Sequence, residues 1–308
     1  MNEKIRNTEA NLSNDSLDFE LLFQLFMSNK WKLIGISFLF SVLAVVYSLS
    51  LPNIFKSEAT LITVSNKSGD GLSSLSGGLS GIAAIAGVNL SGGDSSEAKL
   101  ALATLKSRQF ITDIIDEYSL KKYLFAVERY DYNSGKLYFN KDIYSEEKDT
   151  WAEIDGESAE PSGQKAYQEF INQFSVFEDT KKGVVRIAFL HQSPMIAKFI
   201  VDKVIYEINT KMKKKAIELA EGNRFYLEGQ IENTSVLSLK EKLYELIEKQ
   251  IETVMLANVR KEYIFETLDP AIVPELKAAP NRVVICLVGG ILGFLFSIAY
   301  VLLFCRVK

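Results

Sequence analysis

Cysteine and histidine are nearly missing from this 308-residue sequence. Cys286 and Cys305 both lie in the last apolar run, and His191 is the single histidine. The two cysteines are about 28 Å apart on a helix, too far for an intrachain disulfide. With no cysteine near His191, neither a zinc site nor a Cys/His nucleophile has its side chains. We expect no metal, no cofactor and no catalytic residue, and a structural role for His191.

Basic residues are also scarce where a phosphate group or a nucleic acid would require them. The segment Gly87–Ser95 (GVNLSGGDS) approaches a phosphate-binding loop but places Gly93 where the lysine must stand. The net charge of −4 gives no broad basic surface, so nucleic-acid binding is not expected. Acid pairs such as Glu146/Glu147 fall in polar stretches and indicate solvated surface rather than a general acid.

Charge is absent from two long runs, Leu33–Leu51 and Val283–Phe304. Each is close to the ~20 apolar residues that cross a bilayer. Trp31, between Lys30 and Lys32, is typical of an interfacial anchor. A cleavable signal peptide is disfavoured, because about 30 residues precede the first run and the run is longer than a signal core. The sequence therefore predicts two transmembrane helices.

The charges near these runs predict the topology. The two tails carry more basic residues than the flanks of the central loop, and long loops translocate largely regardless of their charge. We expect both termini in the cytoplasm. The expected segments are 1–32 (cytoplasmic), 33–51 (transmembrane), 52–282 (periplasmic), 283–304 (transmembrane) and 305–308 (cytoplasmic tail). Gly289-x-x-x-Gly293 in the second run predicts close helix packing, with the first run or with a neighbouring subunit.

The central region reads as a mixture of strands and helices. The Gly/Ser-rich stretch 69–93 also carries several apolar residues, which predicts a loop that docks on a surface. Residues 130–160 mix Tyr, Asn, Asp and Gly and predict irregular structure. The expected strands are Ile54–Val64, Phe174–Phe177, Val184–Leu190 and Tyr263–Thr267, and the expected shorter helices are Ser95–Tyr118 and Gln164–Phe174.

Two long helices dominate the second half of the central region, over about 194–258. Ser193-Pro194 has the residues of a helix start, and an apolar stripe runs from there to Tyr226. This predicts about 35 residues, or about 50 Å, with Gly222 and Gly229 as candidate bends. Helices of this length usually need a partner surface. A basic run on the first helix is either a solvated face or a contact for an anionic glycan or lipid-linked polymer; it comprises Lys211, Lys213, Lys214 and Lys215.

Three segments together resemble the Wzz-type chain length determinants, also called polysaccharide co-polymerases. The first two are LDFELLFQLFMSNKWKLIG (Leu17–Gly35) and LPNIFKSEATL (Leu51–Leu61). The third, VMLANVRKEYIFETLDPAIVPE (Val254–Glu275), continues to Pro280-Asn281-Arg282 and the second apolar run. The proline-rich approach to that run, with Pro270, Pro274 and Pro280, is the most specific part. The resemblance extends over most of the chain.

The resemblance implies an α+β protein of a Gram-negative inner membrane. Two transmembrane helices would flank a periplasmic α/β base with a long helical hairpin, and subunits would form rings. The implied function is to regulate the chain length of a surface polysaccharide, O-antigen of lipopolysaccharide, beside a separate polymerase and without a kinase domain. Direct contact with a lipid-linked glycan is possible under this reading.

Other functions remain open on sequence alone. One alternative is a capsule or exopolysaccharide co-polymerase, or an export adaptor, working with a separate kinase. A two-span sensor is less favoured, because the expected tails leave no room for a signalling module.

Overall fold

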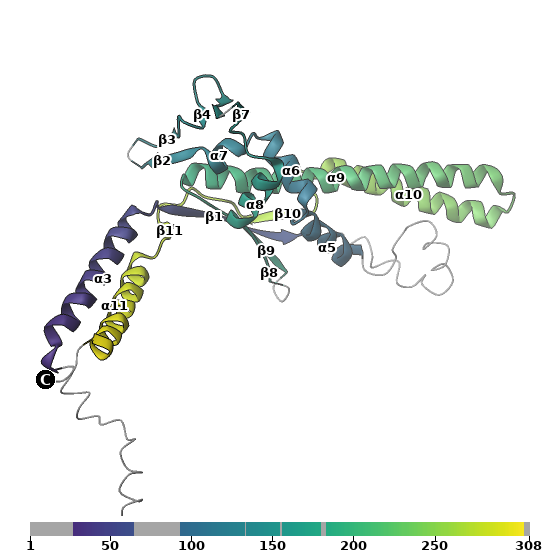
Figure 1. Ribbon diagram of the computed structural model, residues 1–308. Helices are drawn as coiled ribbons and strands as arrows, with labels where there is room; N and C mark the ends of the chain where they lie inside the picture. Colours follow the sequence, from purple (N-terminus) through teal and green to yellow (C-terminus); the bar gives the residue numbers. More distant parts are fainter. Residues whose placement is uncertain (1–26, 65–92, 133, 155, 180–182, 305–308) are drawn as a thin grey trace, which may run out of the picture. The chain divides into compact units, whose positions relative to one another are not determined.

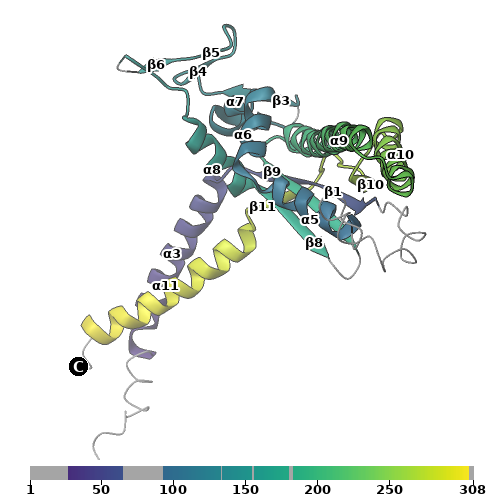
Figure 2. The same cartoon turned by 90° about the vertical axis from the view of Figure 1, so that its right-hand side faces the viewer.

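The computed structural model describes residues 27–64, 93–132, 134–154, 156–179 and 183–304. The chain divides into two compact units (Figures 1 and 2). One unit comprises Met1–Asn53 with Ala278–Lys308, and the other comprises Ile54–Lys277. Residues 69–92 of the Gly/Ser-rich stretch, which is predicted to be a docking loop, lie outside the described residues. Most of the segment that approaches a phosphate-binding loop, Gly87–Ser95, lies outside them too.

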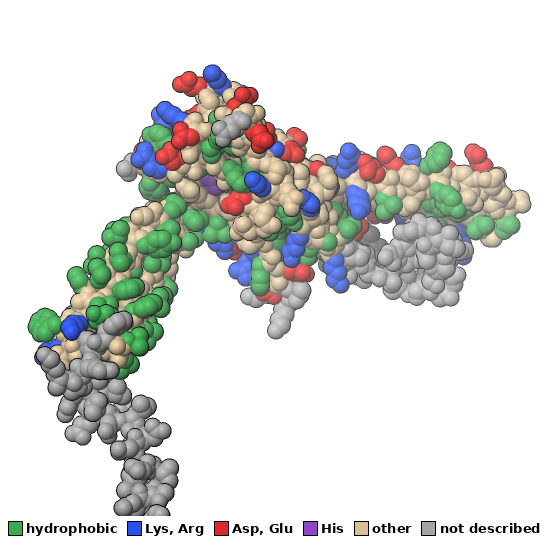
Figure 3. All heavy atoms as spheres, viewed as in Figure 1, with side chains coloured by type: hydrophobic (Ala, Val, Ile, Leu, Met, Phe, Trp, Pro, Cys, Tyr) green, Lys and Arg blue, Asp and Glu red, His purple; other side chains and the backbone are tan. Residues whose placement is uncertain are grey.

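The first unit is a pair of antiparallel helices, α3 (Lys30–Ser50) and α11 (Arg282–Phe304). Their lengths of 21 and 23 residues correspond to about 31 and 34 Å, enough for a hydrocarbon core of about 30 Å. Hydrophobic side chains cover the visible faces of both helices (Figure 3), and only 11% of each apolar window is buried. Apolar side chains facing outward on helices of this length fit a membrane protein with two spans.

The second unit is built on an antiparallel sheet whose strands follow the order β10-β1-β9-β8. The strands are β1 (Ile54–Thr63), β8 (Phe174–Asp179), β9 (Val184–His191) and β10 (Phe265–Asp269). The pairing of β1 with β9 runs from Phe55 opposite His191 to Ile62 opposite Val184. β11 (Lys277–Ala279) lies at the boundary of the two units. The strands predicted at Ile54–Val64 and Val184–Leu190 are confirmed.

One face of this sheet is buried and forms the core. Alternate residues of β1, such as Ala59 and Leu61, are fully buried, as are Ile187 and Phe189 of β9, which is the period-2 pattern of a sheet with one covered face. The first half of the long helix α9 and three shorter helices supply most of the rest of the same cluster. The shorter helices are α5 (Gly93–Leu105), α6 (Arg108–Glu117) and α8 (Gly163–Gln173).

The long helical hairpin consists of α9 (Pro194–Asn233) and α10 (Leu237–Val259), which lie side by side in both views (Figures 1 and 2). α9 has 40 residues, or about 60 Å, longer than predicted, and it runs unbroken through Gly222 and Gly229. The glycines do not interrupt it, because a single glycine costs only about 1 kcal/mol in a helix interior. Ser193 caps the helix as predicted by accepting from the amide of Ile196.

Two predictions for the middle of the chain are wrong. The single helix expected over Ser95–Tyr118 is two helices, α5 and α6, because the Ser107 side chain accepts from the amide of Phe110 and starts a new helix. Residues 130–160 are not irregular but contain short antiparallel pairs, whose turns use the positive φ of Gly135, Asp149 and Gly156. Strands of two to five residues leave too little alternation to recognise in a sequence.

The short strands that correct this prediction are β2 to β7, and a short helix precedes them. Their bounds are α7 (Lys121–Phe125), β2 (Val127–Asp131), β3 (Lys136–Phe139), β4 (Tyr144–Ser145), β5 (Thr150–Trp151), β6 (Glu153–Ile154) and β7 (Glu157–Ser158). They pair β2 with β3, β4 with β5 and β6 with β7. The edge-on contact of Tyr144 with Trp151, at a centroid distance of 5.4 Å, joins β4 to β5.

Candidate functional site

The glycines of the second apolar run face the first one. A Cβ atom added at Gly289 would lie 2.3 Å from the Cβ of Ala44, and one at Gly293 would lie 2.6 Å from the Cβ of Phe40. Gly290 differs, because its added Cβ would meet only a side-chain oxygen at an ordinary 3.5 Å. The two glycines therefore let the backbones of α3 and α11 approach closely, as small residues do in membrane helix pairs.

The same helix pair contains an aromatic contact next to Gly293. The rings of Phe40 and Phe296 are stacked, with centroids 5.4 Å apart and planes at 9°. A side chain at Gly293 would push against the Cβ and Cγ of Phe40 and so disturb this stack. The glycine spacing and the stack together define one contact stripe along α3 and α11.

The three prolines of the approach to α11 occupy different environments. Pro270 is exposed at the edge of a cavity, next to the buried Ala271. Pro274 and Pro280 are half-buried, and the peptide bond before Pro280 is cis. Between Pro270 and Pro274 the backbone is held by Ser57, whose hydroxyl donates to the carbonyl of Ile272 at 2.8 Å.

The four lysines of the basic run do not share one face. Lys211 forms an ion pair with Asp113 of α6 at 2.9 Å and lies 5.7 Å from the ring of Phe110. The hydrogen bond from Lys211 lowers the pKa of the Asp113 carboxyl. Lys214 lies 3.9 Å from Glu218 and is exposed, as is Lys215, whereas Lys213 is half-buried. Since successive residues are 100° apart on a helix, only part of this run is presented to any one ligand.

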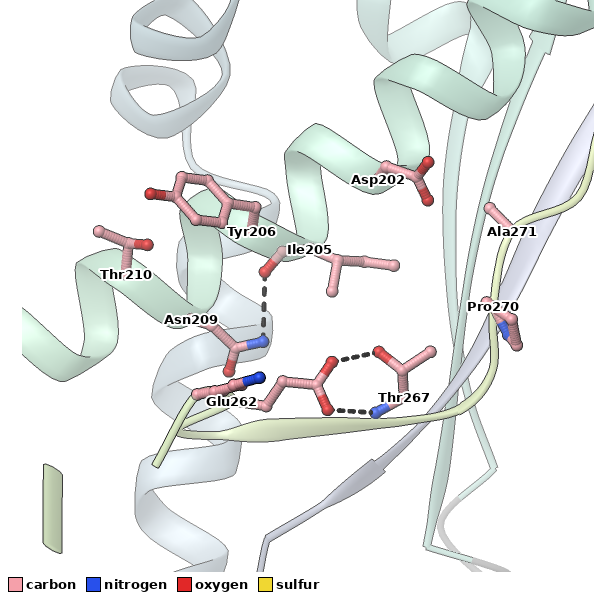
Figure 4. A pocket seen from close by; sticks show the side chains of 10 residues that line it. Asp202, Ile205, Tyr206, Asn209, Thr210, Glu262, Thr267, Pro270 and Ala271 are labelled. Atoms are coloured by element: carbon pink, nitrogen blue, oxygen red, sulfur yellow. Dashed lines mark hydrogen bonds between the residues drawn. The ribbon is translucent and has the colours of Figure 1, made fainter. Parts of the chain in front are cut away.

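A cavity of about 250 Å³ lies between α9 and the segment that contains β10 (Figure 4). Its wall combines polar side chains with an exposed tyrosine ring and the apolar side chains of Ile205, Pro270 and Ala271. The lining residues are Asp202, Ile205, Tyr206, Asn209, Thr210, Lys261, Glu262, Thr267, Pro270 and Ala271. The Glu262 carboxylate is already engaged, because it accepts from both the amide and the hydroxyl of Thr267. Thr267 therefore holds this carboxylate in place at the cavity wall.

Asn209 forms the floor of the same region and fixes the start of β10. Its Oδ1 accepts from the backbone amides of Tyr263, Ile264 and Phe265 at 2.9–3.0 Å. Its Nδ2 donates to the carbonyls of Ile205 at 3.2 Å and Phe265 at 3.0 Å. The strand predicted at Tyr263–Thr267 starts two residues later, at Phe265, because these amides are bound to a side chain instead of a neighbouring strand.

His191 lies at the junction of β9 and α9 and is 5% exposed. The amide of Ser193 donates to its Nδ1 at 2.9 Å, so the proton is on Nε2, which donates to the carbonyl of Tyr123 at 2.8 Å. Burial lowers the pKa of the imidazole, against the smaller opposite effect of these bonds. The neutral ring thus ties α7 to the start of α9.

Apolar side chains on the hairpin remain exposed within a single chain. They include Phe225 and Leu219 of α9, which are 80% and 59% exposed. On α10, Leu237, Tyr244, Met255 and Val259 are exposed. Between the two helices a small apolar cluster around Leu227, Leu243 and Ile247 is buried. Large apolar side chains exposed in this number on one hairpin indicate an interaction surface.

The structure also shows features that sequence reasoning missed. Asn209 carries five hydrogen bonds. The signal that could have identified it is a polar residue directly after Ile208 of the apolar stripe.

Among the residues that the structure describes, no group of three or more His, Cys, Asp or Glu side chains is placed to hold a metal ion.

Comparison with known proteins adds one sequence match. Residues 15–118 match the model of the "Chain length determinant protein" family, Wzz, and the resemblance to this family is confirmed over that segment. A comparison with curated protein sequences gives no match.

Two solved structures are similar to the chain. A "full-length bacterial polysaccharide co-polymerase" has a TM-score of 0.41 and 10% identity, covering 94% of this chain and 96% of that one. A fragment of WzzB, a polysaccharide co-polymerase from Salmonella Typhimurium, has a TM-score of 0.26 and 8% identity, covering 74% and 100%.

Proposed function

We propose that this chain, which carries a Wzz chain length determinant segment over residues 15–118, regulates the chain length of a surface polysaccharide without catalysing its synthesis. The match to the family model carries the proposal. The specific polymer proposed is the O-antigen of lipopolysaccharide, and the working partner is a separate polymerase in the same inner membrane. The proposed topology has both termini in the cytoplasm and Pro52–Arg282 in the periplasm.

The proposed working form is a homo-oligomeric ring, and the exposed apolar side chains of the hairpin support it. Phe225 and Leu219 lie on a helix whose second half packs against α10 in the part of the chain that the structure describes. A second copy of the same hairpin would cover these side chains and gain the free energy of burying them, about 1.5–3 kcal/mol for each large apolar side chain. Substituting Phe225 by Asp is expected to shift the detergent-solubilised protein to smaller complexes, while Lys214→Asp, an exposed control on the same helix, is not.

The paired glycines are proposed to matter for assembly or for contact with the polymerase. Leucine at both Gly289 and Gly293 would force α3 and α11 apart, since their Cβ atoms alone approach α3 to 2.3 and 2.6 Å. Gly290→Ala is the matched control, because its Cβ has room. Unchanged complex size and an unchanged glycan profile in the double variant would refute the role.

Deleting the gene tests the proposed function. Lipopolysaccharide from the deletion strain is expected to lose a cluster of long chains and to regain it when the gene is restored. An unchanged ladder with lost capsule would favour the alternative, a capsule or exopolysaccharide co-polymerase or export adaptor working with a separate kinase. No change in any glycan would reject both readings.

The exposed lysines of α9 are proposed as the part of the basic run that meets an anionic or lipid-linked glycan. Lys214 and Lys215 are exposed, whereas Lys211 is tied to Asp113. Charge reversal at 214 and 215 is expected to alter the chain-length profile while leaving complex size unchanged. An unchanged profile would identify the run as an ordinary solvated face.

A further inference from the structure

The chain enters and leaves the second unit close to the two apolar helices in sequence. β1 begins at Ile54, four residues after α3 ends at Ser50, and Leu276 lies six residues before α11 begins at Arg282. At no more than about 3.6 Å per residue, Ile54 and Leu276 lie within about 15 and 22 Å of the helix ends. Covalent connection alone thus keeps this end of the unit near the bilayer.

An aromatic cluster covers the start of β1. Phe55, which is 5% exposed, is stacked on Tyr132 at a centroid distance of 6.0 Å and meets the ring of Tyr130 edge-on at 6.5 Å. Tyr132 itself is 57% exposed, and its hydroxyl donates to the carbonyl of Glu275 at 3.3 Å. The cluster therefore joins β1 to the segment that leads to α11.

That segment is fixed by its backbone while its apolar side chains point to the outside. Ser57 holds the carbonyl of Ile272 and Tyr132 holds that of Glu275. The side chains of Ile272, Val273 and Leu276 are nevertheless 65%, 44% and 84% exposed. A segment that is held by polar contacts and still displays three large apolar side chains is left uncovered by the residues that the structure describes, and large uncovered apolar patches mark interaction sites.

We propose that these residues dock into the interfacial layer of the bilayer as a second, non-spanning membrane contact. The proposed surface, called here the β1-start surface, consists of Tyr130, Tyr132, Ile272, Val273 and Leu276. We choose a lipid layer as the partner of this surface, because only a few residues of chain connect the surface to each of the two apolar helices. Tyrosine rings with a polar hydroxyl, beside branched aliphatic side chains, also have the chemistry of interfacial anchors. The inference does not depend on any role in polysaccharide synthesis.

Nitroxide accessibility in nanodiscs tests the proposal on the full chain. Cys286 and Cys305 are replaced by Ala, and single cysteines are introduced at 276, at 272 and, as a control, at 237. Leu237 is a matched control because it is the same residue type as Leu276 and is 72% exposed at the far end of the hairpin. All three positions are exposed, so the label does not disturb the core.

Labels at 276 and 272 are expected to collide more with dissolved oxygen, which concentrates in lipid, than with a water-soluble nickel chelate. The label at 237 is expected to show the reverse preference. Equal access of the nickel chelate at 276 and 237 would overturn the proposal. Shielding of 276 and 272 from both reagents would also overturn it, because a protein partner would then cover the surface.

Discussion

Replacing Asn209 with leucine removes the side chain that holds the start of β10 against α9. Leucine has the same branched shape but no polar atoms, so the amides of Tyr263, Ile264 and Phe265 lose their shared acceptor. The carbonyl groups of Ile205 and Phe265 lose a donor. Because Asn209 is 5% exposed, the orphaned groups lie in a region with little water to replace these bonds.

The magnitude follows from the groups left unsatisfied. A buried polar group without a partner costs about 1–3 kcal/mol. Three amides share one oxygen, and the adjacent cavity admits some water, so the expected loss of unfolding free energy is about 3–6 kcal/mol rather than the full sum. For a unit of this size, each kcal/mol shifts Tm by about 2–4 °C. We expect Tm to fall by about 6–24 °C.

Thermal unfolding of the full chain in nanodiscs, combined with amide hydrogen exchange, measures this effect. Asn223→Leu is the matched control, since Asn223 is on the same helix but makes one 3.4 Å contact, with Gln250. Its Tm is expected to change by a few degrees at most. If Asn209→Leu shifts Tm no more than the control, and exchange at 263–265 is unchanged, the account of this site is wrong.

Three further predictions concern local interactions. His191, with a pKa lowered by burial, stabilises the fold fully above its usual pKa of about 6.5. This contribution is lost as pH falls from there through the lowered folded-state value, at up to about 1.4 kcal/mol per pH unit; His191→Gln should reduce the difference in Tm between pH 7 and pH 5. Ser107→Ala removes the cap of α6 and should cost about 1 kcal/mol, measured by denaturant unfolding, whereas Ser134→Ala in an exposed turn should not. Tyr263, whose pKa burial raises to about 12, should remain un-ionised at pH 11 in an ultraviolet titration, and ionisation near pH 10 would contradict its burial.

Much of the architecture was predictable because its periodicity is strong. The apolar runs, β1, β9 and the two long helices each repeat one pattern over eight or more residues, and Ser193-Pro194 marks the start of α9. The break between α5 and α6 was missed because a single capping serine interrupts an otherwise continuous helical spacing. The paired strands between 127 and 158 are too short to leave a pattern.

The candidate sites were only partly predictable. The spacing of Gly289 and Gly293 predicted a packing stripe, and the structure places both glycines against α3; their role in assembly stays a prediction. Asn209 was missed because its partners are 54–56 residues away in sequence, and such pairings follow from the fold alone. The division of the lysine run was missed for the same reason, since Lys211 is bound by Asp113 of a distant helix.

Reconstitution of polymer synthesis tests the central claim most directly. The candidate polymerase and its lipid-linked repeat units would be placed in proteoliposomes with and without this chain, and the product lengths compared on a gel. With the chain present, the account predicts a narrow cluster of long products at an unchanged rate of repeat consumption. A length distribution that is the same with and without the chain would contradict a role in chain-length control.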